Sequence, residues 1–374
     1  MKQLFLFNPE NDIALGLGLP HITPPRQAAL LHKAGAMLPF WLGNINDSIL
    51  IDSYDITLAN KWRNELIADI GISGPSPISQ ISTNENFTLC PWGWSCDAIA
   101  QFRKFGINEI TFTQLKETMP IRRELSHRRT ALHFLTQWSH NIKPLNFPLP
   151  TEAKSAQDIT SFLNDNDNAI LKSPWSSSGR GVFPISKSTL PASLPRIDGI
   201  IRNQGSIIIE PLLPKIQDFA MLFNYNNGFA DFAGYSLFFN STSTNYGGNF
   251  VASDETILKK LSQWIPSSEM EATRDLVANT LAKVLGNNYS GPLGIDMMVC
   301  GKDGNTWLDP CVEINLRYTM GFVAKGVFTK LGKEGVMSIS PKNSKPLSHK
   351  KEGDKPIRLV PKNDWFDFIF YPNV

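Results

Sequence analysis

The sequence has little of what marks a secreted, membrane or metal-cage protein. Its 374 residues include four cysteines, too few for a disulfide framework and without the close paired spacing of a zinc site. We expect these cysteines (Cys90, Cys96, Cys300 and Cys311) to be reduced and mostly buried. No stretch stays apolar for a membrane span, and Glu10 and Asp12 interrupt the apolar N-terminus before it reaches signal length. We therefore expect a cytoplasmic protein without a membrane partner.

An excess of one charge is also missing. Lysine plus arginine number 36 and aspartate plus glutamate 34, so a nucleic-acid partner is not expected. Hydrophobic residues make up 42% and charged residues 19%, which excludes global disorder. There is no internal repeat, no GxxxxGK[ST] phosphate loop and no GxGxxG dinucleotide fingerprint after a strand. Any phosphate site must be of another kind.

The order of apolar patterns predicts more than one lobe, as the chain length also does. QLFLFNP reads as a buried strand, and the region to about residue 115 alternates apolar runs with helical segments, as in α/β folds. Residues 126–138 carry apolar residues at helical spacing after Ser126, a candidate N-cap. A boundary near residues 115–125 follows.

The second half of the chain reads as α+β, built around antiparallel sheet. Strands are expected in AILKSP, SIIIEPLL, DFAMLFNY and FADFAGYSLFF. PSSEMEATRDLVANTLAKVLG has the pattern of a long helix that ends at a glycine, and GIDMMVCGKDGNTWLDPCVEINLR that of two strands around a Lys-Asp-Gly-Asn turn. Residues 341–358 read as a solvated lysine-rich loop, and WFDFIFY as a strand that packs back.

A loop short on side-chain bulk follows one of these strands, in LKSPWSSSGRGV. Small residues let backbone N–H groups converge on an anion, and Lys172 adds a charge at the strand end. The loop residues are Ser176, Ser177, Ser178, Gly179, Arg180 and Gly181. A surface hairpin would use the same residue types, so the loop alone decides little.

A second group of polar residues lies on the two late strands. Glu313 and Asn315 are two residues apart and share one face of a strand, and Asp296 lies on the expected partner strand. Three hard oxygen ligands of this kind suit Mg²⁺. Arg317 shares the face and would stabilise a transferring phosphate, although Glu313 pairing with Arg317 is a plain structural alternative.

Three further segments carry polar or aromatic groups. In FNPENDIALG, residues 8–12 either line a cleft at the end of the first strand or cap a turn and a helix start. Asn245 and Tyr246 follow a strand in a loop that approaches a ligand or is a plain hairpin. Trp92 and Trp94 read as a packed aromatic loop.

Three motifs follow one another along the chain: a lysine at the end of a strand, a loop of small residues, and a late set of two acids and an asparagine. In this order they resemble the ATP-grasp superfamily over about residues 120–330. The resemblance implies a mixed α/β plus α+β chain in which a pre-ATP-grasp-like α/β lobe precedes two subdomains that hold ATP between them. The expected divisions are 1–118 for the first lobe, 119–205 and 206–338 for the two subdomains, and 339–374 for the polar loop and last strand.

The resemblance also implies roles for individual residues. Lys172 would contact the ATP α- and β-phosphates under the loop 176–181, and Asp218 the ribose hydroxyls. Arg128 would be the basic residue just inside a helix, with His127 and Arg129 as alternatives. The linker strand at the adenine is Glu210, Pro211, Leu212 and Leu213; the Mg²⁺ ligands are Asp296, Glu313 and Asn315; the catalytic groups are Lys172 and Arg317.

Two departures from the family pattern bear on these roles. The hairpin between Asp296 and Glu313 is long, so a bulge is needed to keep both on one face. Gly294 stands where some ligases have a basic residue, which removes a possible oxyanion donor.

The expected function is a ligase that uses Mg-ATP to activate a small-molecule carboxylate as an acyl phosphate for attack by an amine, a thiol or another nucleophile. A nucleotide-binding ATP-grasp protein without ligase activity is the alternative. A purely structural α/β protein, with a coincidental Ser/Gly loop and acidic strand, is a third reading. The sequence names neither substrate.

Overall fold

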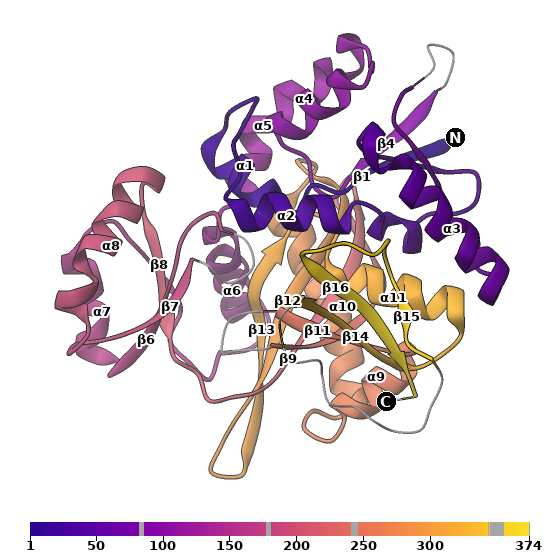
Figure 1. Ribbon diagram of the computed structural model, residues 1–374. Helices are drawn as coiled ribbons and strands as arrows, with labels where there is room; N and C mark the ends of the chain where they lie inside the picture. Colours follow the sequence, from indigo (N-terminus) through magenta and orange to yellow (C-terminus); the bar gives the residue numbers. More distant parts are fainter. Residues whose placement is uncertain (82–85, 177–180, 241–245, 343, 345–354, 374) are drawn as a thin grey trace.

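The structure is a computed structural model that describes residues 1–81, 86–176, 181–240, 246–342, 344 and 355–373. Within these ranges the strands form three sheets, which Figure 1 shows as an N-terminal lobe, a middle lobe set apart to one side, and a large sheet between and below them. No helix in the described ranges has the length and apolar character needed to cross a membrane.

The N-terminal lobe is built on a parallel sheet in the order β3-β2-β1-β4. Its strands are β1 (Lys2–Leu6), β2 (Ser48–Leu50), β3 (Ser76–Ile78) and β4 (Phe87–Pro91). Its helices are α1 (Asn11–Leu17), α2 (Arg26–Gly35), η1 (Leu38–Trp41), η2 (Ser53–Asp55), α3 (Ile56–Ile70), α4 (Cys96–Lys104) and η3 (Glu109–Phe112). Leu4, Phe5 and Leu6 of β1 are buried, as a parallel strand covered on both faces requires. The expected α/β lobe is confirmed.

Two helices lead from this lobe to the next, α5 (Thr113–Leu125) and α6 (Arg129–Asn141). Ser126 does not cap α6 as expected, because α5 continues up to it and Ser126 donates its N–H to the carbonyl of Arg122. Arg128 is the N-cap residue of α6 instead. The division expected after residue 118 falls inside α5, which also contains Pro120.

The middle lobe is an antiparallel sheet in the order β5-β8-β6-β7, and α7 and α8 pack on it. Its elements are β5 (Thr151–Ala153), α7 (Ala156–Asp165), β6 (Asn168–Lys172), β7 (Val182–Ser186), α8 (Leu190–Gln204) and β8 (Ile207–Pro211). Although β8 follows the division expected after residue 205, it pairs with β5 and β6. We therefore propose that the lobe ends between β8 and β9.

The large sheet runs in the order β13-β12-β9-β10-β11-β14-β16-β15 and is antiparallel throughout. Its strands are β9 (Lys215–Asn226), β10 (Phe229–Asn240), β11 (Tyr246–Val251), β12 (Ser290–Lys302), β13 (Asn305–Asn315), β14 (Gly335–Pro341), β15 (Ile357–Arg358) and β16 (Phe366–Pro372). Its helices are α9 (Asp254–Leu261), α10 (Ser267–Leu285) and α11 (Met320–Leu331). The expected last strand is therefore confirmed as β16, which pairs with β14 and β15.

The hairpin of β12 and β13 carries the expected bulge. Asp303 and Gly304 form its turn with φ of 52° and 81°, values that suit a tight two-residue connection. Asp296 pairs with Glu313, and Met298 with Asp309, so residues 310–312 lie opposite Met297 alone. The bulge restores the register, and Glu313 and Asp296 share one face.

Candidate nucleotide and metal site

Three neighbouring rows of side chains cross β9, β12 and β13. The rows are Asp218–Met298–Asp309, Ala220–Asp296–Glu313 and Leu222–Gly294–Asn315. Successive rows are two residues apart along each strand outside the bulge, so all three present side chains to one face. The register of the sheet thus brings the expected metal ligands together in two adjacent rows.

This face forms the floor of a cavity of about 310 Å³, the polar cavity, which lies where the middle lobe, the large sheet and the N-terminus of α11 meet. Side chains expected at a nucleotide line it: Arg128, Lys172, Ser176, Asp218, Asp296, Glu313, Asn315 and Arg317. A second cavity of about 360 Å³, the apolar cavity, lies beside it and shares the wall residues Lys172, Val182, Lys215, Asp218 and Val312.

The apolar cavity has the linker strand as one wall. Glu210, Pro211, Leu212 and Leu213 all line it, as do Leu135, Phe147, Ile170 and Met298. A largely apolar cavity beside a charged one suits a molecule with an apolar end and an anionic end.

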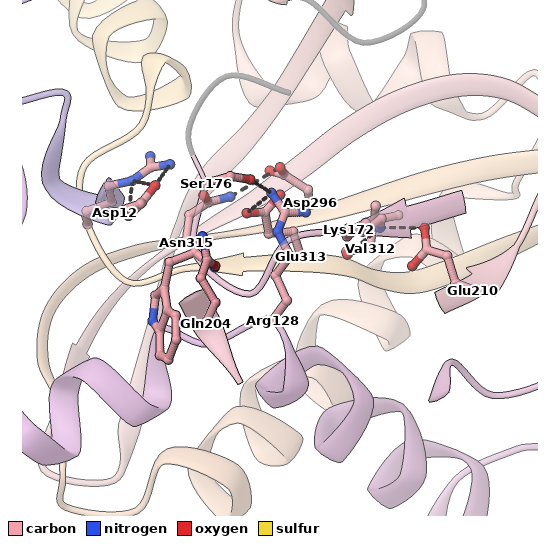
Figure 2. A network of polar contacts seen from close by, with 12 residues as sticks. Asp12, Arg128, Lys172, Ser176, Gln204, Glu210, Asp296, Val312, Glu313 and Asn315 are labelled. Carbon is pink, nitrogen blue, oxygen red and sulfur yellow. Dashed lines mark hydrogen bonds and ion pairs between the residues drawn. The ribbon is translucent and has the colours of Figure 1, made fainter. Parts of the chain in front are cut away.

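Lys172 ends β6 at the junction of the two cavities. Its Nζ lies 2.5 Å from Glu210 Oε1 and donates to the carbonyl of Val312 at 3.2 Å. The side chain is buried, so its charge depends on these partners. Figure 2 shows this pair at one side of a row of polar contacts that continues through Arg128 and Glu313 to Asp12.

Arg128 is the basic residue that enters the polar cavity. Its Nη2 lies 3.1 Å from Glu313 Oε1 and donates to Ser176 Oγ at 3.2 Å. Arg129 instead pairs with Glu152 at 3.2 Å. His127 is buried, and burial followed by the Arg129 charge lowers its pKa to about 4, so it is neutral and packs edge-on against Trp175. Of the three alternatives, Arg128 has the geometry of an anion ligand.

The small-residue loop is described only at its ends, since Ser177, Ser178, Gly179 and Arg180 lie outside the described residues. The Ser173 N–H donates to the Gly181 carbonyl at 2.8 Å and closes the loop base. A Cβ at Gly181 would lie 2.5 Å from Ser176 Oγ, so glycine is required there. Trp175 anchors the base, with its Nε1 donating to the Arg123 carbonyl.

The acidic pair Asp296 and Glu313 has the electrostatics of a cation site. Burial and then the Glu313 carboxylate raise the pKa of Asp296 to about 7, because two like charges face each other across one strand pair. Asn315 Nδ2 donates to Asp296 Oδ2 at 3.1 Å, which gathers the three groups. The described residues hold no group of three His, Cys, Asp or Glu side chains placed to bind a metal ion. Two carboxylates and an amide nevertheless fit Mg²⁺, which usually takes few protein ligands beside phosphate oxygens and water.

Arg317 is held by a residue that the sequence did not connect with it. Its Nε donates to both Asp12 carboxylate oxygens, at 3.1 and 3.0 Å, and its Nη2 donates to Oδ2 at 2.8 Å. Burial lowers the pKa of Arg317, but the carboxylates of Asp12, Glu313 and Asp296 together raise it above its usual value. The alternative in which Arg317 pairs with Glu313 is wrong, since Glu313 pairs with Arg128.

The other polar residues of the FNPEND segment hold the N-terminal lobe together. Asn8 donates to the Gly93 carbonyl at 2.8 Å and accepts the Gly93 N–H. The buried Glu10 accepts from His32 Nδ1 at 2.9 Å and makes no helix-cap hydrogen bond. The segment therefore acts through contacts distant in sequence: Asn8 fixes the backbone at Gly93, and Asp12 binds Arg317, which lines the polar cavity.

The far end of the polar cavity contains residues that the sequence analysis missed or set aside. Asn249 is fully buried and donates to Ser236 Oγ at 2.7 Å, and Tyr246 donates to Asn249. Thr319 and Gly321 lie beside them, at the N-terminus of α11, which has no side-chain cap. The sequence could have predicted this helix start, because Thr319 is a favoured N-cap residue type and precedes the apolar run MGFVA. The uncapped N-terminus adds positive partial charge to this end.

Asp218 and Gly294 also have defined surroundings. Asp218 Oδ2 lies 2.7 Å from Lys215 Nζ and accepts from Asn240 Nδ2 at 3.0 Å. A Cβ at Gly294 would lie 3.1 Å from Thr319 Cγ2. The basic residue that some ligases have near this position is therefore replaced by a close backbone approach.

Comparison with known proteins gives the fold. No protein-family model and no curated protein matches the chain. Among solved structures, the biotin carboxylase domain of Hydrogenobacter thermophilus 2-oxoglutarate carboxylase, in complex with Mg-ADP, ADP and bicarbonate, is 10% identical with a TM-score of 0.54, over 99% of this chain and 86% of that one. Campylobacter jejuni biotin carboxylase, in complex with β-γ-ATP, is 11% identical with a TM-score of 0.51, over 100% and 87%. The chain therefore shares the ATP-grasp fold of these two structures, N-terminal lobe included.

Proposed function

We propose that the protein is an ATP-dependent ligase that phosphorylates a small-molecule carboxylate and transfers the acyl group to an amine, a thiol or another nucleophile. The observation that carries this proposal is the convergence of Lys172, Arg128 and Arg317 on the Asp296–Glu313 row. These residues come from the start of α6, the end of β6 and the β12–β13 hairpin with the residues just after it, and they line one polar cavity that shares wall residues with the apolar cavity.

The proposed nucleotide lies across both cavities. Its base occupies the apolar cavity against residues 210–213, and Asp218 accepts hydrogen bonds from the ribose hydroxyls. Lys172, Arg128 and the loop 176–181 surround the phosphates. Asp296, Glu313 and Asn315 would hold Mg²⁺, which when bound neutralises charge on the phosphoryl group.

The cations in the polar cavity already have carboxylate partners, which favours binding by exchange. Arg128 is bound to Glu313 and Lys172 to Glu210. A phosphate that binds Arg128 and Lys172 would leave Glu313 and Glu210 free of these cations. Glu313 would then become available to a divalent ion as the nucleotide arrives.

The acceptor carboxylate is proposed to bind between Arg317 and the N-terminus of α11. A carboxylate oxygen attacks the γ-phosphorus, ADP leaves, and the nucleophile then displaces phosphate from the acyl phosphate. With the carboxylate bound there, Arg317 and the α11 N–H groups would stabilise the developing negative charge by their position and charge.

Thermal melting tests the nucleotide site first. A non-hydrolysable ATP analogue should raise the melting temperature in a magnesium-dependent way. Asn315→Ala should lose the magnesium dependence, whereas Asn305→Ala, an exposed asparagine at the start of the same strand, should keep it. ADP release stimulated by pools of carboxylic acids and amines then tests the ligase. Binding without any stimulated release would favour a nucleotide-binding protein, and no melting shift would contradict both.

A further inference from the structure

Asp309 is a buried carboxyl in the wall of the apolar cavity that the proposed mechanism does not use. The other two carboxylates of that wall are paired, Glu210 with Lys172 and Asp218 with Lys215. Asp309 Oδ1 accepts the Cys311 N–H at 3.0 Å. Among the described residues, Asp309 Oδ2 has no hydrogen-bond partner.

Asp309 Oδ2 is not among the fully buried polar atoms that lack a partner in the described residues, so it is open to the cavity and available to a ligand there. Burial raises the pKa of Asp309 to about 7, against the hydrogen bond from the Cys311 N–H. The nearby Glu210 carboxylate raises this pKa further and Lys172 lowers it. Near neutral pH the free oxygen therefore exists both as an acceptor and as an O–H donor.

The register of the sheet places Asp309 at a defined distance from the ribose-binding candidate. Asp218, Met298 and Asp309 form one row across β9, β12 and β13. Two strand spacings separate Asp218 from Asp309, or about 10 Å between their backbones. This is close to the length of a nucleoside from its ribose hydroxyls to the far edge of its base. Met298 lies between the two acids, under the nucleoside.

We propose that Asp309 Oδ2 hydrogen-bonds the substituent at the six-position of the purine and selects a 6-amino base over a 6-oxo base. The inference rests on the proposed function, which puts the base in this cavity. An ionised Oδ2 accepts a hydrogen bond from the amino group of adenine and repels the oxo group of hypoxanthine. The apolar wall and residues 210–213 contact both bases alike.

The test compares the affinities of ADP and inosine diphosphate, with Mg²⁺, by calorimetry. Wild type should bind ADP about tenfold more tightly, the effect of one hydrogen bond to a charged group. In Asp309→Asn the Cys311 N–H keeps the amide oxygen at Oδ1, so the amide NH₂ faces the cavity and donates to the oxo group. The preference should then vanish or reverse. Asp303→Asn makes the same change at the exposed turn of the hairpin and should keep the wild-type ratio.

The wild-type protein offers an independent readout if Asp309→Asn fails to fold. The groups whose charges act on Asp309 or respond to it are Lys172, Glu210, Cys300 and Cys311, and Asp218 lies in its row. Because a protonated Oδ2 donates to an oxo group as well, the preference for ADP should be smaller at about pH 6 than at about pH 8.5.

The outcomes separate this inference from the proposed function. If wild type binds neither nucleotide, both are overturned. If ADP binds but inosine diphosphate binds equally well at high pH, or if Asp309→Asn keeps the wild-type ratio, only the role of Asp309 is overturned. A ratio that does not change with pH in wild type counts against it in the same way.

Discussion

The polar and apolar cavities share several wall residues but differ in how the charged side chains of their walls are paired. In the polar cavity, Arg128, Arg317, Lys172 and Lys215 each have a carboxylate partner within 3.1 Å. In the apolar cavity, Asp309 has a free oxygen and most of the wall is hydrophobic.

The difference shows that the two ends of one ligand would gain binding free energy in different ways. A charged group that enters the polar cavity must exchange partners with carboxylates already in place, so its gain is the difference between two ion pairs. A base that enters the apolar cavity meets a slot that needs no such exchange, and its gain comes from apolar burial and one hydrogen bond. Specificity for the base and response to the phosphates are thus separable by mutation.

The largest effect should come from Glu313→Gln. The change removes one carboxylate of the acidic pair and the charged partner of Arg128. We expect turnover to fall about 1,000-fold, the upper range for loss of one preorganised charged group, and the magnesium-dependent melting shift to disappear. Glu255→Gln, an exposed glutamate in the first turn of α9, is the control. A variant that keeps the magnesium-dependent shift would contradict the metal assignment.

Lys172→Ala should cost about 3 kcal/mol of unfolding free energy, because it leaves Glu210 without its cation in a low-dielectric wall. The double variant Lys172→Ala/Glu210→Ala should be more stable than the single variant. Urea unfolding of the two, with Lys187→Ala as an exposed control, measures the difference. Equal stabilities of the single and double variants would show that the pair is not coupled.

Asp12→Asn should have a smaller effect, about 2 kcal/mol of unfolding free energy, because the amide still accepts one hydrogen bond from Arg317. Turnover should fall about tenfold as the guanidinium loses its fixed orientation. Asp69→Asn, at the exposed end of α3, should change neither. Wild-type turnover in Asp12→Asn would show that Arg317 acts without its partner.

The most graded effect concerns pH. The pKa values of Asp296 and Asp309 are raised from 3.8 to about 7, so between these values the folded protein binds protons that the unfolded chain has released. Stability should therefore fall as pH rises from about 4 to 7, by about 1.4 kcal/mol per pH unit for each group, and level off above.

Urea unfolding across this pH range should show that the free energy of unfolding of Asp296→Asn falls less steeply with pH than that of wild type. Magnesium should also flatten the wild-type slope, because a cation favours the ionised pair. If Asp296→Asn has the same pH dependence of stability as wild type, groups other than Asp296 cause that dependence.

The sequence predicted those features that depend on nearby residues. Strand alternation and the Lys-Asp-Gly-Asn turn located the β12–β13 hairpin, and the two-residue spacing of Glu313 and Asn315 placed them on one face. The need for a bulge followed from the length of the hairpin alone. The prediction that Ser126 caps the N-terminus of α6 was wrong, because a residue type that favours N-caps can also lie at the end of the preceding helix.

Features that depend on which strands become neighbours were beyond the sequence. Asp12 meets Arg317 only because the N-terminal lobe packs against the end of β13. Asn240 reaches Asp218 through the pairing of β9 with β10. The sequence assigned Asp309 no role, because its place in the apolar cavity depends on the register of β13 with Met298 and Asp218.

The contact between Asp12 and Arg317 joins residues 305 positions apart. Likewise, Trp41 Nε1 donates to the Leu359 carbonyl across 318 positions. During synthesis on the ribosome, Asp12 therefore emerges long before Arg317 is made. Until then the Asp12 carboxylate of the N-terminal lobe lacks this partner. Closing so long a loop is slow, so the lobes should form first and the candidate site last. A chain interrupted before residue 317 would hold folded parts but no assembled site.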